Sequence, residues 1–279
     1  TISENKGKKA QNRTYQDLLK NPNDEFNFEQ LALSDLVKVS LDGETEVWLP
    51  SAMYRGVSFS PDGEYVMVTT IEKPFSYLVT YRRFPSKTIV YDKNAKLVET
   101  LIEVPLIEDL PQGFMATRTG RRNFRWRDDQ PSTIIYAEAL DGGDPKKEVD
   151  FRDEVFELKA PFNGKGKSIL KTVNRFSGIT WGNDNIAVAY DYWWNTRNTK
   201  TYVFNPSNTK KKVEIIFDRN YQDRYSDPGG FETRKNKLGS YVLALKDDKG
   251  FLLGDGFTEE GQFPFIHSYD FTTKNKEVL

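Results

Sequence analysis

Residues 58–66 read SFSPDGEYV, and this stretch decides the fold. Two short apolar-containing segments flank a Pro-Asp-Gly turn, in which proline presets φ while aspartate and glycine accept the turn geometry. The pattern predicts a strand, a tight turn and a second strand. The same arrangement recurs around Trp126 and Trp181, and more faintly around Leu245. The chain therefore carries a loosely repeated unit.

The spacing of these units indicates the architecture. Phe59, Trp126, Trp181 and Leu245 follow one another at steps of 67, 55 and 64 residues. Common propeller blades repeat at roughly 40–50 residues, so blades with insertions fit these steps. Blades stack radially because no single blade buries its own faces. We predict an all-β chain, a β-propeller of about four blades plus a hairpin, which forms part of a larger seven- or eight-bladed ring.

The predicted domain boundaries follow from the turn signals. Residues 1–34 form a polar N-terminal segment with one short helix near 15–19, and residues 35–279 form the partial propeller region. Within it, the four units are expected at about 55–106, 120–172, 175–217 and 231–279. The additional hairpin, residues 36–49, has the pattern of the outer pair of strands of a separate blade.

Composition excludes several classes of function. The 279 residues include 40 basic and 41 acidic side chains, so a net charge of −1 argues against a nucleic-acid partner. No apolar run approaches the roughly 18 residues of a membrane helix, so no membrane span is predicted. With no cysteine and one histidine, His267, neither a Cys/His nor a multi-His metal site can form. We therefore expect no metal and no cofactor.

Two clusters are candidates for substrate binding. In the basic-aromatic stretch 121–127, alternation along a strand places Arg121, Arg125 and Arg127 on one face, where forked guanidinium groups suit carboxylates, and Arg122 on the other face with the aromatic residues. Ion pairs between blades are the alternative, and we place it somewhat ahead. The second cluster contains two adjacent tryptophans, which point to opposite sides of a strand, and a nearby arginine. Either a partner contact or core packing fits its members, Trp193, Trp194 and Arg197.

Catalytic residues are not predicted in this chain. No G-x-S-x-G elbow of an α/β-hydrolase occurs. Paired carboxylates support glycoside chemistry, but aspartate is also the commonest turn residue, and that explanation is favoured for each candidate. These candidates are Asp128, Asp129, Asp184, Asp191, Asp247 and Asp255.

Four long motifs resemble a known family. They are residues 122–131 (RNFRWRDDQP), 138–145 (EALDGGDP), 193–202 (WWNTRNTKTY) and 254–265 (GDGFTEEGQFPF). They are similar to the N-terminal propeller of prolyl oligopeptidase family serine peptidases, in the glutamyl endopeptidase-like branch. The resemblance covers roughly residues 50–279. It implies a C-terminal α/β-hydrolase domain that carries the catalytic residues and is absent from this chain, so no catalytic residue is carried over.

The resemblance therefore implies the non-catalytic propeller portion of a secreted or periplasmic serine peptidase, which gates and selects peptide substrates. The chain alone is expected to be inactive. Its implied partners are the hydrolase domain of the same parent protein and a peptide substrate, and open strand edges also allow a homodimer. A stand-alone propeller that binds protein or glycan is the alternative, and a carbohydrate-active propeller ranks behind it.

Overall fold

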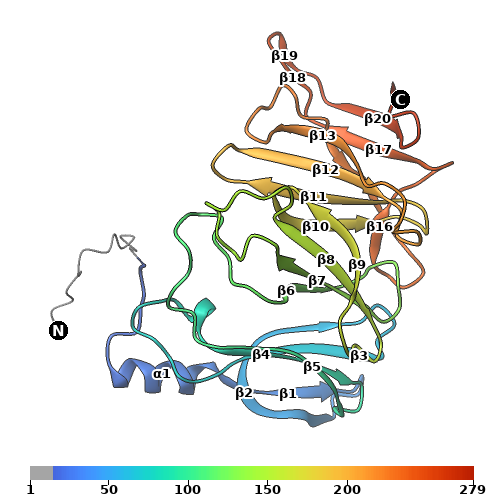
Figure 1. Cartoon of the computed structure of the whole chain (residues 1–279). Helices are drawn as coiled ribbons and strands as arrows, with labels where there is room; N and C mark the ends of the chain where they lie inside the picture. The colour runs from blue at the N-terminus through green and yellow to red at the C-terminus, as the bar shows by residue number, and fades with distance from the viewer. Residues whose placement is uncertain (1–14) are drawn as a thin grey trace, which may run out of the picture.

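Antiparallel sheets follow one another along the chain in the computed structural model, which describes residues 15–279 (Figure 1). The first sheet has the order β1-β2-β3-β4-β5. Its strands are β1 (Leu33–Val39), β2 (Thr45–Phe59), β3 (Tyr65–Ile71), β4 (Ser86–Asp92) and β5 (Leu97–Val104). The second has the order β6-β7-β8-β9. Its strands are β6 (Arg122–Trp126), β7 (Thr133–Ala139), β8 (Asp153–Lys159) and β9 (Lys167–Thr172).

The third and fourth sheets repeat the four-stranded order. The third is formed by β10 (Arg175–Trp181), β11 (Ala187–Trp193), β12 (Asn198–Phe204) and β13 (Glu214–Asn220). The fourth is formed by β14 (Gly230–Phe231), β17 (Lys249–Gly254), β20 (Phe265–Asp270) and β21 (Lys276–Val278). Two small ribbons are inserted in it, β15 (Thr233–Lys235) with β16 (Tyr241–Leu243), and β18 (Phe257–Thr258) with β19 (Gly261–Gln262).

The four units are blades of a β-propeller, which confirms the predicted fold class. The sheets stack in chain order, and the first and fourth lie at opposite ends of the stack (Figure 1). A separate apolar core fills each space between neighbouring sheets: Trp126 and Met67 between the first and second, Trp181 and Val155 between the second and third, and Leu252 between the third and fourth. Stacking thus buries the faces that a single sheet would leave in water.

The repeated marker residue has a physical role. Trp126 and Trp181 end the innermost strands of the second and third sheets, and each packs against the sheet before its own. Leu245 packs against residues of the third sheet in the same way. Phe59 ends the innermost strand of the first sheet and is 68% exposed. The first marker has no preceding blade to cover it in the described part of the chain.

The N-terminal hairpin differs from the prediction. β2 is a single strand of 15 residues that pairs first with β1 and then with β3, so the hairpin is joined to the first sheet without a break. The hairpin folds back on the outer face of this sheet, where Trp48 and Leu49 pack with Val66 and Val68. The one helix of the described N-terminal part is α1 (Pro22–Ala32), capped by Asn21, and not the predicted helix near 15–19. Residues 1–14 of the predicted polar segment lie outside the described residues.

Long connections gather at one end of the first two sheets. Antiparallel order places the β3–β4 connection (72–85), the β5–β6 connection (105–121) and the β7–β8 connection (140–152) at the end where β6 begins and where β2 starts to pair with β3. The first of these contains the 3-10 turn η1 (Tyr81–Arg83). At the opposite end, residues 60–64 form a tight turn, as predicted. Functional groups are thus best sought at the end with the long connections.

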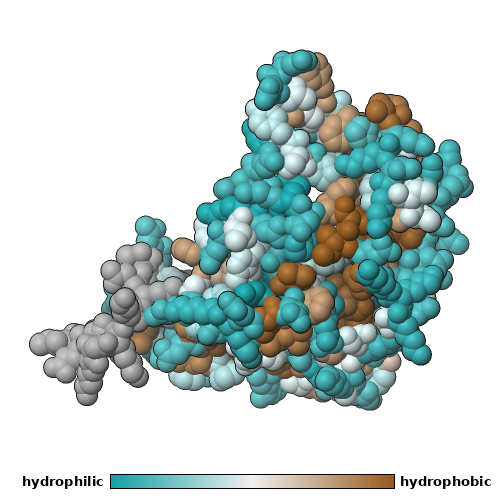
Figure 2. Space-filling model, turned by 45° about the horizontal axis from the view of Figure 1, so that its top comes forward, coloured by the Kyte–Doolittle hydropathy of each residue, from teal (hydrophilic) through white to brown (hydrophobic). Residues whose placement is uncertain are grey.

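The surface is largely hydrophilic on the face in Figure 2, with apolar patches among the charged areas. None of the helices in residues 15–279 is long and apolar enough to cross a membrane.

Candidate functional site

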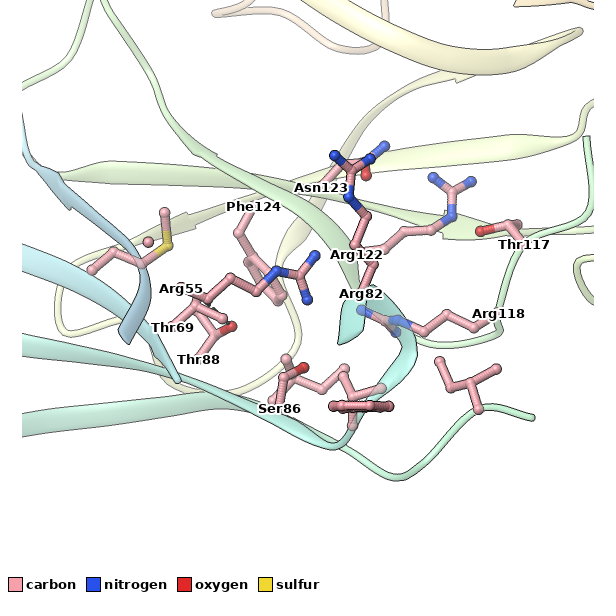
Figure 3. Close-up of a pocket in the computed structure, with 16 residues that line it drawn as sticks. Arg55, Thr69, Arg82, Ser86, Thr88, Thr117, Arg118, Arg122, Asn123 and Phe124 are labelled. Atoms are coloured by element: carbon pink, nitrogen blue, oxygen red, sulfur yellow. Dashed lines mark hydrogen bonds between the residues drawn. The ribbon is translucent and has the colours of Figure 1, made fainter. Parts of the chain in front are cut away.

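A cavity of about 440 Å³ lies between the first and second sheets, at the end with the long connections (Figure 3). Innermost strands β2 and β6 and strands β3 to β5 form its walls, and η1 and the β5–β6 connection form its rim. Small hydroxyl side chains, Thr69, Ser86 and Thr88, lie along one side. The cavity is therefore built by two blades and by segments far apart in the sequence.

Four arginines line this cavity, which we call the basic cavity. Arg55 comes from β2, Arg82 from η1, Arg118 from the β5–β6 connection and Arg122 from β6. Arg55 and Arg118 extend into the hollow from opposite sides (Figure 3). None of the sixteen lining residues is acidic. The lining therefore attracts anions.

Most of this positive charge has no carboxylate partner in the described part of the chain. Within residues 15–279, the structure records an ion pair for Arg122, with Asp153, and none for Arg55, Arg82 or Arg118. Arg118 instead donates to the backbone oxygens of Thr119 and Arg121. Burial, with the nearby charges of Arg122 and Arg55, lowers the pKa of the Arg118 guanidinium to about 10. An anion in the cavity would stabilise the charged guanidinium of Arg118 and so counteract the lowering of its pKa by burial and by the neighbouring arginines.

Arg122 contributes an unsatisfied donor to the cavity. The residue is 7% exposed, and its Nε is buried without a hydrogen-bond partner. A buried donor that lacks an acceptor costs about 1–3 kcal/mol, more when it is charged. The cavity is where an acceptor could reach Arg122, since that residue is part of its lining.

A network of ion pairs with residues of the second and third sheets holds the Arg122 side chain in place. Asp153 pairs with Arg122 and, at 3.1 Å, with Arg175, and the Arg175 guanidinium also reaches Asp141 at 2.7 Å. Arg152 pairs with the same Asp141 at 2.9 Å. These five residues join the second and third sheets, and the three arginines outnumber the two aspartates. The guanidinium of Arg122 is thereby held in a rigid setting.

The predicted arginine site does not assemble as a unit. Arg125 is exposed on β6 and lies against Gly178 of β10. Arg121 donates to the Gly164 oxygen at 2.6 Å, over the Tyr136 ring. Arg127 is 5% exposed, with ion pairs to Asp129 and Glu157, so it has no surface to offer a substrate. Both acids belong to the second blade, so these ion pairs lie within one blade and not between blades; the contact of Arg127 with the third sheet is a cation–π contact with Trp181.

The tryptophan pair divides as the strand alternation requires. Trp193 is buried, with the Arg152 guanidinium 3.9 Å from its ring centroid, and supports the ion network. Trp194 is 40% exposed, and the Arg197 guanidinium lies 3.6 Å from its ring centroid. The second tryptophan therefore remains available at the surface.

Two of the candidate aspartates have structural roles. Asp129 pairs with the buried Arg127. Asp191 is 1% exposed, and its carboxylate accepts from the Tyr202 hydroxyl and from the backbone and side chain of Asn174. Burial raises the pKa of Asp191, although these donors act in the opposite direction. Among residues 15–279, no group of three or more His, Cys, Asp or Glu side chains could hold a metal ion.

Sequence reasoning missed the residues of the basic cavity. Strand alternation predicts Arg122 on the aromatic face of its strand, and that alternation does not point to Arg55, Arg82 or Arg118. A usable signal does exist in the two connections that meet at the cavity. Residues 81–83 (YRR) and 117–122 (TRTGRR) carry basic residues without a neighbouring acid, in a chain whose charges are otherwise mixed.

Comparison with curated proteins identifies close relatives. Over 277 residues the chain is 38% identical to a protein from Oryza sativa subsp. japonica named "Probable glutamyl endopeptidase, chloroplastic", with 97% of the chain aligned. It is 39% identical over 288 residues to the protein of the same name from Arabidopsis thaliana, with all of the chain aligned. The chain spans 30% of the length of each of these relatives. No protein-family model matches the chain.

Solved structures show weaker likenesses. The β-propeller domain of the trilobed protease from Pyrococcus furiosus is 13% identical, with a TM-score of 0.45 over 88% of this chain and 63% of that one. The acylaminoacyl peptidase of Pyrococcus horikoshii is 12% identical, with a TM-score of 0.44 over 85% of this chain and 34% of that one. From its sequence relatives and its stacked four-stranded sheets, the chain is a β-propeller region that is related to one part of glutamyl endopeptidase-like proteins.

Proposed function

We propose that the chain is the non-catalytic, substrate-selecting part of a serine peptidase, and that its basic cavity receives a carboxylate of the peptide substrate. The observation that carries this proposal is the excess of arginine in the cavity: four arginines line one space, and among residues 15–279 only Arg122 of these four is recorded in an ion pair with a carboxylate. The planar guanidinium group of arginine binds a carboxylate through two parallel, charge-assisted hydrogen bonds.

The relatives support the peptidase part of the proposal. Their names describe glutamyl endopeptidases, and almost the whole chain aligns with 30% of their length. Peptide hydrolysis by the whole protein, through an acyl-enzyme formed on a hydrolase domain, is proposed on this basis. Selection by the propeller would then add to the specificity of that domain, because the two regions contact different parts of one substrate.

The proposed location is periplasmic or secreted, and it rests on the sequence resemblance. The two plant relatives are named chloroplastic.

The first test measures binding of blocked peptides that contain one glutamate, or glutamine at the same position, to the 279-residue chain by calorimetry. We expect the glutamate peptide to bind at least tenfold more tightly, because a neutral amide cannot compensate the positive charge of the arginines. Arg82→Gln and Arg118→Gln should each remove most of this preference. Arg234→Gln, which removes one charge from an exposed residue of β15, is the matched control.

Two results would contradict the proposal. Equal affinity for the two peptides would show that the cavity does not distinguish a carboxylate from a neutral amide. Equal losses in Arg118→Gln and Arg234→Gln would show that net charge, rather than the cavity, causes the preference.

A further inference from the structure

We infer that an exposed aromatic ledge beside the basic cavity binds an apolar side chain of the same peptide whose carboxylate occupies the cavity. The aromatic ledge consists of Phe114, in the β5–β6 connection, and Trp194, at the turn between β11 and β12. The inference rests on the proposed function, because it assigns a second contact of the same peptide.

The two rings form one apolar surface. Phe114 is 81% exposed and Trp194 is 40% exposed, and their ring centroids lie 5.4 Å apart. The Arg197 guanidinium stacks on Trp194 and is itself held, since it donates to the Trp194 oxygen at 2.9 Å. The Trp194 ring is thus fixed on one side by a cation, and its contact with Phe114 extends the apolar area.

The connection that carries Phe114 is anchored directly after this residue. Next in the chain, Met115 is buried, and its backbone oxygen accepts from the Arg175 Nε at 3.0 Å. The Thr117 N–H donates to the Gly143 oxygen at 3.1 Å. Gly143 has φ +81°, and a Cβ there would lie 1.9 Å from the Thr117 oxygen, so this close approach requires glycine. A well-anchored backbone therefore presents Phe114 to the solvent.

The ledge is continuous with the basic cavity. A smaller hollow of about 160 Å³ lies between the second and third sheets, and Phe114 and Arg175 are among its lining residues. It shares three lining residues with the cavity, Thr117, Arg122 and Asn123. A peptide in the cavity can thus continue across this hollow to the ledge in an extended conformation, at about 3.3 Å per residue.

The chemistry of the ledge favours an apolar or aromatic side chain. Two rings give a large contact area, and aromatic pairs gain from offset or edge contacts beyond the area that they bury. Arg197 already occupies a stacking position on Trp194, so a second cation would meet repulsion there. The peptide that fits both sites has a carboxylate and an apolar residue a few positions apart.

The test uses the 279-residue chain and blocked peptides that contain one glutamate and, two to five residues away, phenylalanine or serine. At the best spacing, we expect phenylalanine to increase the affinity about five- to tenfold over serine. Phe114→Ala and Trp194→Ala should each remove most of that gain and leave the affinity for the serine peptide within about twofold. Phe26→Ala, at a 59% exposed position on α1, is the matched control.

The outcomes separate the two ideas. If phenylalanine gives the same gain in the wild type and in both ledge variants, or gives no gain, the ledge is not a binding site. The proposed function then still stands if Arg118→Gln weakens glutamate binding. If no glutamate peptide binds at all, the proposed function fails and the ledge fails with it. Should Trp194→Ala not fold, Phe114→Ala, at the more exposed position, decides the question.

Discussion

Asp153 shows how strongly one side chain can determine the setting of the basic cavity. Its carboxylate pairs with Arg122 and Arg175 and also accepts the Phe176 N–H at 2.7 Å. It is fully buried, so each of these donors depends on it. Since Arg122 lines the cavity and Arg175 lines the neighbouring hollow, Asp153 orients groups in both without lining either.

Replacing Asp153 with asparagine should therefore destabilise the chain by about 3–5 kcal/mol, because it leaves two buried guanidinium groups without their shared counter-charge. Urea unfolding followed by tryptophan fluorescence measures this change. Glu103→Gln removes one partner of the exposed Lys87 pair and should change the stability by less than about 1 kcal/mol. A similar small effect of both substitutions would show that the ion network does not stabilise the fold.

Single residues were also where sequence reasoning was least reliable. Strict alternation predicts Arg122 on the aromatic face of β6 and Arg127 on the same face as Arg121 and Arg125. Arg127 is in fact buried, because Glu157 and Asp129 offer it carboxylates that lie 30 and 2 positions away in sequence. Which arginine finds a buried acid depends on tertiary neighbours, and no local pattern records them.

At the level of elements, β6 departs from regular pairing beside the cavity. Its register with β7 shifts between Arg122 and Arg125, and Asn123 has φ 57°. Asparagine tolerates this left-handed conformation, whereas a β-branched residue does not. The bulge explains why Arg122 and Arg125 do not follow a simple strand alternation.

We expect Asn123→Gly to retain the fold, with a change in stability of less than about 1 kcal/mol, since glycine adopts the same φ without strain. Asn123→Val should lower the free energy of unfolding by about 1–3 kcal/mol. Thermal unfolding of the two variants checks the difference. Equal stability of the glycine and valine variants would mean that the bulge relaxes at little cost.

Strands and turns, in contrast, were well predicted from the sequence. The unit expected at 120–172 is observed as β6 to β9, and the unit expected at 175–217 as β10 to β13. Their turn residues act over a few positions, so the sequence contains the information directly. The basic cavity could not be found in this way, because it combines a β2 residue with two connections that only the stacking of blades brings together.

At the scale of the whole molecule, the fourth sheet has an uncovered outer face. Leu252 faces the third sheet and is buried, while its neighbour Leu253 points away and is 47% exposed. Leu253 pairs with Ile266, which is 49% exposed, and Ile266 accepts the N–H of Leu279. These three residues form an apolar row across the sheet.

This row predicts self-association of the 279-residue chain. Sedimentation velocity should show a concentration-dependent dimer at micromolar concentrations, because apolar sheet faces pair to leave water. Ile266→Lys should shift the chain to monomer, whereas Phe26→Lys, which adds the same charge on α1, should not. A monodisperse monomer of the unaltered chain at high concentration would contradict this prediction.

The undivided strand β2 folds the first blade back on itself. Near the start of the strand, the Trp48 Nε1 donates to the Lys93 oxygen at 3.1 Å, and the Lys93 N–H donates at 3.0 Å to the oxygen of Glu64, just beyond the end of the strand. The two ends of β2 therefore lie near each other, and the strand turns back between them. Arg55 lies in the register shift between Tyr54 and Gly56, where the pairing with β3 begins. The packing of the N-terminal hairpin thus holds the segment that carries one charge of the cavity.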